Sequence, residues 1–283
     1  MNTITLNCNA KINLSLDGVR KREDGYHDLE LIFLEIPVFD TITVSLRDDT
    51  EIHLSCDDKT LPCDTGNIAY RAAAAFFNAA KLSLGADIEL VKRIPHGAGL
   101  AGGSADAAGV LKALNKLTEE PLSTDALMKI GATLGADVPF CIMGGCALAE
   151  GIGDILTPLP TPPKLFYVIA KPKESVSTAF VFKNLDLNNR PDGLCVSAVA
   201  EGIRRGDLDM MFKNSVNILE TVTAKHFPII NDIKACFTES GAILSLMSGS
   251  GTSVFGAFET EELANTAANA VKKYTDKIFI VGQ

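Results

Sequence analysis

The chain has 283 residues, of which 47% are hydrophobic and 22% charged, and its formal net charge is −9. Proportions this close to the globular average exclude a disordered or low-complexity chain, and the length allows one large domain or two ordinary ones. Because 35 acidic residues outnumber 26 basic ones, a general grip on the phosphates of a nucleic acid is also disfavoured. Any phosphate ligand must therefore be bound locally.

The sequence gives no sign of export or membrane insertion. The first ten residues alternate polar and apolar side chains, so we expect no signal peptide. No apolar run approaches the roughly 18 to 20 residues of a membrane span. The seven cysteines form no C-x-x-C pair, which argues against a disulfide framework and a zinc site. We expect a cytoplasmic protein.

Short strands dominate the first third of the predicted secondary structure. Alternating patterns predict strands at residues 3–9, 12–16, 29–36, 41–46, 51–55 and 87–91, with Asp40 and Asp48 among the breaks. Between the last two strands, Asn67 can cap a helix that runs to about residue 82 and is ended by Gly85.

A glycine-rich segment at residues 96–103 precedes the next predicted helix. The apolar residues of this helix fall at i, i+3, i+4 and i+7, namely Ala107, Val110, Leu111 and Leu114. Ser123 caps a further helix, Gly135 ends it, and Asp137 follows in a short loop before Pro139.

The richest proline cluster, at residues 158–163, predicts a linker between two domains, residues 1–157 and 158–283. Beyond it the predicted order is strand, helices, two strands, helix and strand. This β-α-β-β-α-β order is typical of the ferredoxin-like arrangement.

The segment from Pro95 to Ser104 is the best candidate for binding phosphate. It holds four glycines within seven residues, between a strand and a helix whose amino end favours anions. A flexible turn is the alternative. The match to G-x-G-x-x-G fails as a dinucleotide site because the acidic residues that follow lie before another helix, and no lysine precedes Ser104 as a Walker motif requires.

Three other places hold candidate functional side chains. Lys11 lies in an apolar strand, where a lysine at a solvated edge is the alternative to a functional one. Asp137 is either a hydrogen-bond acceptor at a helix end or a base. Together, a lysine and an aspartate facing a phosphate loop would form a phosphoryl-transfer site. Tyr26 and His27 could stack on a base or decorate the surface.

The turn at residues 248–252 joins two predicted strands. As a hairpin turn it needs no function, but it offers several hydrogen-bond donors to an anion.

These segments together resemble the GHMP kinase superfamily. The landmarks are the strand with Lys11, the Pro-x-Gly-x-Gly-Leu-x-Gly-Gly-Ser loop at residues 95–104 and the Gly-Ser-Gly turn at residues 249–251. The resemblance implies an α+β fold of two domains, an N-terminal ribosomal protein S5 domain 2-like domain for ATP binding and catalysis and a C-terminal ferredoxin-like domain. Segments 10–14, 22–27, 134–139 and 149–153 resemble one branch, whose substrate carries a cytidine diphosphate group.

The resemblance also implies a role for each matched residue. Asp137 accepts the proton of the substrate hydroxyl, and Lys11 beside it stabilises charge on the transferring phosphoryl group. The substrate is contacted by Asn13, Tyr26, His27, Thr178 and Phe182. ATP, the co-substrate that arrives with Mg²⁺, is held by Asn67 at adenine and, at the phosphates, by Pro95, Gly97, Gly99, Leu100, Gly102, Gly103 and Ser104. Ala98 and Ala101 depart from the glycines common in this loop.

The alternatives belong to three classes. A sister kinase could act on another alcohol, such as homoserine or mevalonate. A non-catalytic nucleotide-binding protein could share the fold, although retention of Lys11 and Asp137 speaks against it. An RNA-associated protein is disfavoured by the acidic balance. We expect a small-molecule enzyme, a monomer or weak homodimer, with no nucleic-acid or membrane partner.

Overall fold

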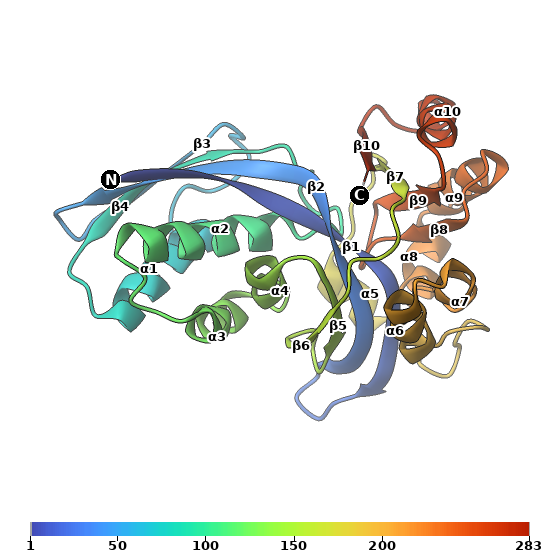
Figure 1. The fold of residues 1–283 in the computed structure, drawn as a ribbon, viewed down its shortest axis with the longest axis horizontal. Helices are drawn as coiled ribbons and strands as arrows, with labels where there is room; N and C mark the ends of the chain where they lie inside the picture. The colour runs from blue at the N-terminus through green and yellow to red at the C-terminus, as the bar shows by residue number, and fades with distance from the viewer. Residues whose placement is uncertain (1, 283) are drawn as a thin grey trace. The chain divides into compact units, whose positions relative to one another are not determined.

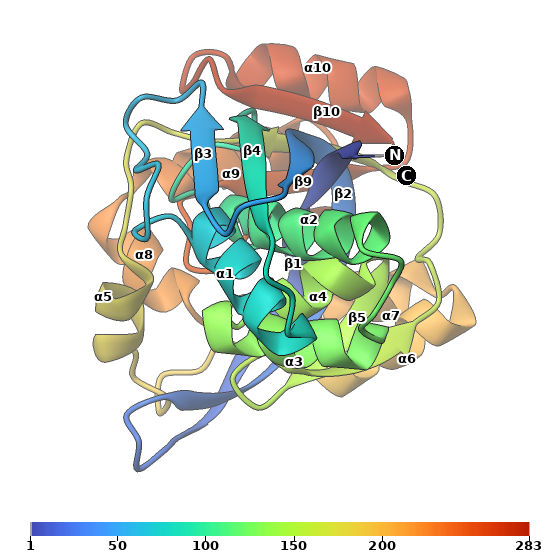
Figure 2. The same ribbon diagram turned by 90° about the vertical axis from the view of Figure 1, so that its left-hand side faces the viewer.

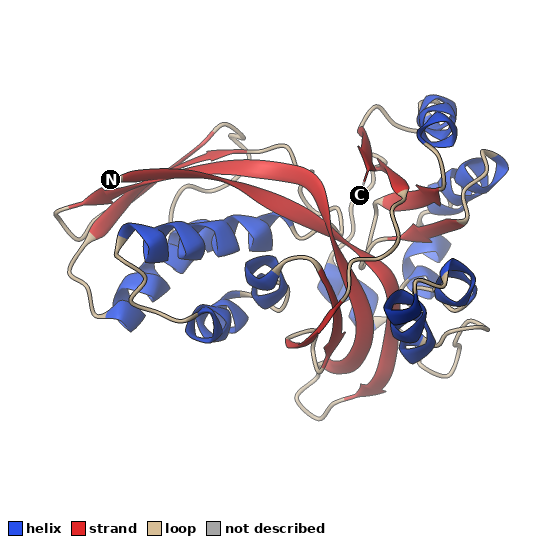
Figure 3. Cartoon of the chain, in the orientation of Figure 1, coloured by secondary structure: helices blue, strands red, loops and turns tan. Residues whose placement is uncertain are grey.

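The computed structural model describes residues 2–282, with the helices and strands labelled in Figure 1 and coloured by type in Figure 3. The chain forms two compact units. Unit 1 contains the chain up to Ala10, Val38–His96 and Ala101–Gly144, whereas unit 2 contains Lys11–Pro37, Gly97–Leu100 and the chain from Gly145 onward. No helix among the described residues is long and apolar enough to cross a membrane.

Two long paired strands, β1 (Thr3–Lys21) and β2 (His27–Arg47), contribute to both units. The sequence predicted each of them as two shorter strands, and this was wrong. Asp40 does not break β2, because its buried carboxylate accepts hydrogen bonds from the backbone N–H groups of Arg93 (2.5 Å) and Ile94 (2.8 Å). A carboxylate satisfied in this way is compatible with a strand interior.

Unit 1 is a sheet with helices on one face (Figures 1 and 2). In it β2 pairs antiparallel with β4, from Thr41 opposite Val91 to Arg47 opposite Gly85, and β4 pairs parallel with β3. Its remaining elements are β3 (Ile52–Cys56), β4 (Gly85–Val91), α1 (Ile68–Ala80), α2 (Gly102–Leu117), α3 (Thr124–Leu134) and α4 (Val138–Met143). The predicted apolar stripe of α2 is buried, which confirms that this face packs on the core.

Helix α1 begins as predicted and ends earlier than predicted. Asn67 caps it, and the helix stops at Lys81 in the left-handed region, φ 55°. Gly85 does not end the helix but begins β4, where a Cβ atom would lie 2.1 Å from the carbonyl oxygen of Glu51. The glycine is therefore needed for close approach of two backbones.

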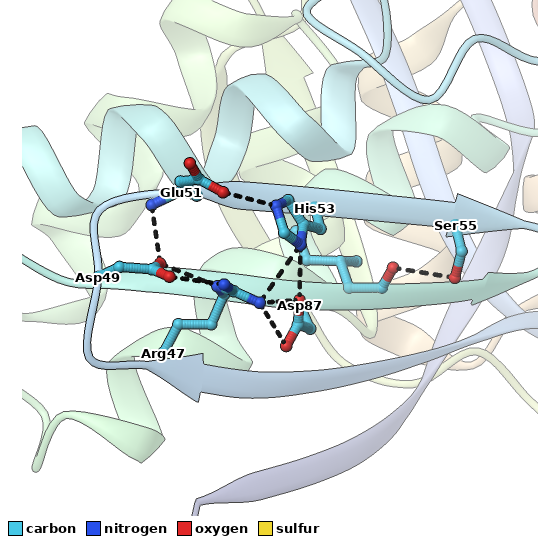
Figure 4. A network of polar contacts seen from close by, with 7 residues as sticks. Arg47, Asp49, Glu51, His53, Ser55 and Asp87 are labelled. Atoms are coloured by element: carbon cyan, nitrogen blue, oxygen red, sulfur yellow. Dashed lines mark hydrogen bonds and ion pairs between the residues drawn. The ribbon is translucent and has the colours of Figure 1, made fainter.

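An exposed network of charged side chains lies where β2 ends and β3 and β4 begin (Figure 4). Arg47 donates to Asp49 and to Asp87, and His53 lies within 3.3 Å of the guanidinium. The hydrogen bond from Arg47 lowers the pKa of Asp49 to about 2. Since ion pairs in water contribute little, this network fixes the local turn more than it stabilises unit 1.

Unit 2 contains two sets of paired strands. The first half of β2 pairs with β5 (Cys146–Glu150), and β5 pairs with β6 (Ile155–Leu159). The second sheet has the antiparallel order β10-β7-β9-β8, formed by β7 (Phe166–Ala170), β8 (Leu244–Met247), β9 (Val254–Phe258) and β10 (Ile278–Gly282).

Six helices accompany these strands. They are α5 (Thr178–Lys183), α6 (Val196–Arg205), α7 (Leu208–Lys213), α8 (Glu220–His226), α9 (Ile229–Glu239) and α10 (Glu261–Val271). The succession β7, helices, β8, β9, α10, β10 confirms the predicted ferredoxin-like order. Strand β6 takes in Pro158 and Leu159, so only residues 160–163 of the predicted linker lie between β6 and β7. The domain boundary between residues 157 and 158 stays a prediction.

Candidate active site

The predicted phosphate loop adopts a conformation that its glycines make possible. Gly97 (φ 60°) and Gly99 (φ 74°) both occupy the left-handed region, which most side chains disfavour. At Gly99 a Cβ atom would also lie 2.0 Å from the carbonyl oxygen of Ser248, so no larger residue fits there. Ala101, which stands where a glycine is common in the family, holds φ 58° at the amino end of α2.

Lys11 is buried in unit 2, with 4% of its surface exposed, so the solvated-edge interpretation is wrong. Its Nζ donates to Asn13 Oδ1 at 2.7 Å and to the carbonyl oxygen of Gly99 at 3.1 Å. Its backbone N–H donates to the carbonyl oxygen of Leu100, and its Nζ lies 5.3 Å from the centroid of the Phe33 ring. A buried ammonium thus lies against the glycine loop, where it can meet the charge of a phosphate.

The turn at residues 248–252 also contacts this loop. The Ser248 hydroxyl donates to the Gly99 carbonyl oxygen at 2.9 Å, and a Cβ atom on Gly249 would lie 3.4 Å from both Lys11 Nζ and Asn13 Oδ1. The structure therefore brings together the turn, the loop at residues 97–100, Lys11 and Asn13.

The aromatic residues expected at the cytosine lie elsewhere in unit 2. The rings of His27 and Phe182 are 5.3 Å apart between centroids and tilted by 30°, whereas Tyr26 is 61% exposed near the tip of the β1–β2 hairpin. Burial lowers the pKa of His27, which keeps its imidazole neutral at pH 7. Thr178, at the start of α5, pairs its hydroxyl with that of Ser250 at 2.8 Å.

The other candidates belong to unit 1. The first turn of α2 follows Pro95 and contains Gly102, Gly103 and Ser104. Gly102 is tightly packed, since a Cβ atom there would lie 3.0 Å from Ile94. Both polar atoms of the Asn67 side chain form hydrogen bonds within the protein. Oδ1 accepts from Ala69 N–H at 2.9 Å, and Nδ2 donates to the Pro62 carbonyl at 2.8 Å.

Asp137 lies at the start of α4, which the sequence did not predict. Pro139 fits the first turn of this helix, where a missing N–H is tolerated. The side chain of Asp137 makes no capping hydrogen bond to the helix. Its two possible roles, as a hydrogen-bond acceptor at a helix end and as a base, both stay predictions.

Sequence reasoning missed a buried charge cluster beneath the amino end of α2. Lys92 Nζ donates to Asp106 at 2.6 Å and also to Asp40, and all three residues belong to unit 1. Asp106 is 2% exposed and its Oδ1 atom has no partner. Burial raises the pKa of Asp106 to about 8, and the nearby Asp40 carboxylate acts in the same direction. The one ammonium that the two carboxylates share lowers this pKa only in part. The signal was a lysine three residues before Pro95 and an aspartate on the apolar face of α2.

This pKa predicts that stability falls as the pH rises. The unfolded carboxyl has a pKa near 3.8, so between about pH 4 and pH 8 the folded chain holds a proton that the unfolded chain releases. The Asp106→Asn variant carries no such proton. Between pH 5 and pH 8, we expect the wild type to lose at least about 1.4 kcal/mol more unfolding free energy than the variant, since that is one pKa unit.

Urea unfolding at the two pH values measures the difference. The exposed Asp48→Asn variant is the control and should follow the wild type. Equal pH dependence in the wild type and Asp106→Asn would show that Asp106 is ionised throughout this range.

Two family models match the chain, the GHMP kinases N terminal domain over residues 67–145 and the GHMP kinases C terminal over residues 199–277. These matches, together with the fold and the glycine loop, identify the chain as a GHMP kinase. A 4-diphosphocytidyl-2-C-methyl-D-erythritol kinase of Alkaliphilus oremlandii is 45% identical and covers 99% of this chain and 97% of its own length. One of Acetivibrio thermocellus is 44% identical, with 99% of both chains covered.

Solved structures agree with these relatives. The crystal structure of a 4-(cytidine 5'-diphospho)-2C-methyl-D-erythritol kinase superposes with a TM-score of 0.83 at 34% identity, covering 99% of this chain and 98% of its own. A homoserine kinase from Cytophaga hutchinsonii, with a TM-score of 0.80 at 21% identity over 100% of this chain and 96% of its own, shares the fold. The chain belongs to the 4-diphosphocytidyl-2-C-methyl-D-erythritol kinase family of the GHMP kinases. The resemblance seen in the sequence is confirmed.

Proposed function

We propose that this chain transfers the γ-phosphoryl group of ATP to the 2-hydroxyl of 4-diphosphocytidyl-2-C-methyl-D-erythritol, in the non-mevalonate pathway of isoprenoid synthesis. The products are the 2-phosphate and ADP. The observation that carries the proposal is the buried Lys11 ammonium, 3.1 Å from the Gly99 carbonyl and enclosed by the turn at residues 248–252. The identity of 45% over 282 residues supports the choice of substrate.

In the proposed reaction the substrate oxygen forms a bond to the γ-phosphorus while the bond from that phosphorus to the ADP oxygen breaks. Asp137 accepts the hydroxyl proton. Lys11 stabilises the negative charge of the transferring group, and the N–H groups of the loop at residues 97–104 hold the phosphates. Positioning and charge neutralisation supply most of the acceleration, because phosphoryl transfer leaves little covalent chemistry for a protein side chain to do.

Mg²⁺ is proposed to enter with ATP. In kinases this ion is held mainly by the substrate phosphates and by one or two protein oxygens. The part of the chain that the structure describes contains no group of three or more His, Cys, Asp or Glu side chains placed to hold a metal. The ion would neutralise phosphate charge and requires no such group.

The aromatic pair predicts where the base binds. If cytosine is held between Tyr26, His27 and Phe182, the Phe182→Ala variant loses stacking worth about 1–3 kcal/mol. We expect its KM for the cytidylyl substrate to rise about tenfold or more, with the KM for ATP unchanged, measured in a steady-state assay.

Phe180→Ala provides a matched control on the same helix. Phe180 is 38% exposed, and its ring lies 5.0 Å from that of His226 between centroids. This variant should keep the KM of the wild type. If both variants raise the KM equally, α5 acts only as a structural support and Phe182 does not contact the base.

Incubation with γ-labelled ATP, Mg²⁺ and candidate alcohols tests the proposal. We expect a new phosphomonoester, detected by ³¹P NMR, with the cytidylyl substrate and none with homoserine or mevalonate, and inhibition by CDP. Product from homoserine or mevalonate alone would identify a sister kinase. ATP binding without consumption would identify a non-catalytic protein, and tight RNA binding would identify the third alternative. We further propose that the enzyme works in the cytoplasm as a monomer or weak homodimer.

A further inference from the structure

Two buried side chains from one segment of unit 2 hold the turn at residues 248–252. Asn217 is 1% exposed, and its Nδ2 donates to the carbonyl oxygens of Met247 and Gly249, each at 2.8 Å. Thr223 is fully buried on α8 and donates from its hydroxyl to the carbonyl oxygen of Ser250 at 3.0 Å. Two hydrogen bonds to carbonyls of the turn and a third to the carbonyl of Met247, the last residue of β8, therefore hold this segment.

Asn217 is also tied to the strand that carries Lys11. Its Oδ1 accepts from the N–H of Leu219 at 3.0 Å, which fixes the amide orientation. On either side of it, Val216 accepts from Leu16 N–H at 2.9 Å and Ile218 donates to the Leu16 carbonyl at 3.0 Å. The Asn217 side chain thus bonds to β8 and the turn, while its two neighbours along the chain bond to Leu16 of β1.

The turn depends on such support because its sequence is Ser-Gly-Ser-Gly-Thr. Gly249 (φ 56°) and Gly251 (φ 92°) occupy conformations that glycine visits easily but loses entropy to keep. The turn also lies close to Lys11, since a Cβ atom on Gly249 would lie 3.4 Å from Lys11 Nζ. A shift of the turn therefore changes the space around the ammonium and around the Gly99 carbonyl.

We propose that Asn217 and Thr223 are positioning residues for phosphoryl transfer. They hold the carbonyls of Gly249 and Ser250 in place. The turn thereby keeps the Lys11 ammonium and the phosphate loop aligned with the γ-phosphate. A misplacement of about 1 Å in such a site can cost about 100-fold in rate. This inference rests on the proposed kinase reaction, and it assigns no contact with substrate to either residue.

The test compares Asn217→Ala with Asn115→Ala. Asn115 is a matched control at the end of α2 in unit 1, 8% exposed, with Nδ2 donating to the Leu122 carbonyl at 2.9 Å and Oδ1 accepting from Leu122 N–H at 3.1 Å. Both substitutions should lower the thermal midpoint by similar amounts, because each leaves buried main-chain groups unpaired. Only Asn217→Ala should lower kcat, by about tenfold or more.

The KM values separate positioning from substrate binding. We expect kcat to fall by a larger factor than the KM for the cytidylyl substrate rises, because His27 and Phe182 lie outside the turn, whereas Thr178 contacts it through Ser250. If kcat of Asn217→Ala stays within about twofold of the wild type while its thermal midpoint falls with that of Asn115→Ala, the role is structural and the inference is overturned.

Thr223 gives an independent test that needs no stable Asn217 variant. Thr223→Val removes the hydroxyl and keeps the shape, whereas Thr223→Ser keeps the donor. We expect kcat to fall about threefold or more in Thr223→Val and to recover in Thr223→Ser. Equal kcat in both overturns the inference. Failure of the wild type itself to phosphorylate the substrate would refute the proposed function, which the wild-type assay reports separately.

Discussion

The Asp137→Asn variant is expected to turn over about 100-fold more slowly than the wild type, or slower still, which is the lower end of the range for loss of a general base. Asparagine has nearly the same size but cannot accept the proton of the substrate hydroxyl. Because asparagine also keeps the shape of the side chain, we expect the variant to fold, so that turnover and stability can be measured separately. Single-turnover kinetics and the thermal midpoint measure the two effects.

Binding and capping controls make this result specific. The affinity for ATP, measured by calorimetry, should stay within about threefold, since positioning of the phosphates belongs to the glycine loop. Asp207→Asn is the matched variant, because Asp207 does cap a helix, accepting from Met210 N–H at 2.9 Å. It should retain full turnover. Activity of Asp137→Asn within tenfold of the wild type would remove Asp137 from the proton transfer.

The Lys11→Met variant should lose about as much activity. Methionine fills the space of the aliphatic stem but removes a buried positive charge that donates to Asn13 and to the Gly99 carbonyl. The transferring phosphoryl group then lacks a charged partner, so kcat should fall about 100-fold or more. Steady-state kinetics with both substrates varied measure kcat and KM separately.

Lys59→Met is the control for loss of a lysine that donates to a backbone carbonyl. Lys59 donates to the Cys56 carbonyl at 2.9 Å at the end of β3, outside the site. Its kcat should equal that of the wild type. If Lys11→Met raised only the KM for the alcohol and kept kcat, Lys11 would bind substrate in the ground state and would not stabilise the transition state.

Local sequence patterns were reliable where one physical effect dominates. Asn67 and Ser123 begin helices as predicted because a side-chain oxygen satisfies an N–H group that the first turn leaves free. The strand order after residue 164 and the helices α6, α9 and α10 were also predicted, since apolar periodicity depends only on neighbours in the chain, whereas the short helices α5, α7 and α8 were not. Lys11 could be singled out in the same way, but its burial could not.

Long-range contacts account for what the sequence did not predict. Asp40 looked like a strand break because its partners, Arg93 N–H and Ile94 N–H, lie more than fifty residues away. Helix α4 was missed because six residues carry too little periodic signal. Asn217 carried no signal at all, since an asparagine in an apolar stretch is unremarkable until its two carbonyl partners are known.

The sequence by itself determined the family, the glycine loop and the identity of the candidate catalytic residues, because these depend on residue types at fixed spacing along the chain. Tertiary structure alone decided that Lys11 is buried against Gly99, that Asp106 and Asp40 share Lys92, and that Asn217 holds the turn beside Lys11. The physical reason is that burial and hydrogen bonding between distant segments set the charge and position of a side chain, and neither is encoded by its immediate neighbours.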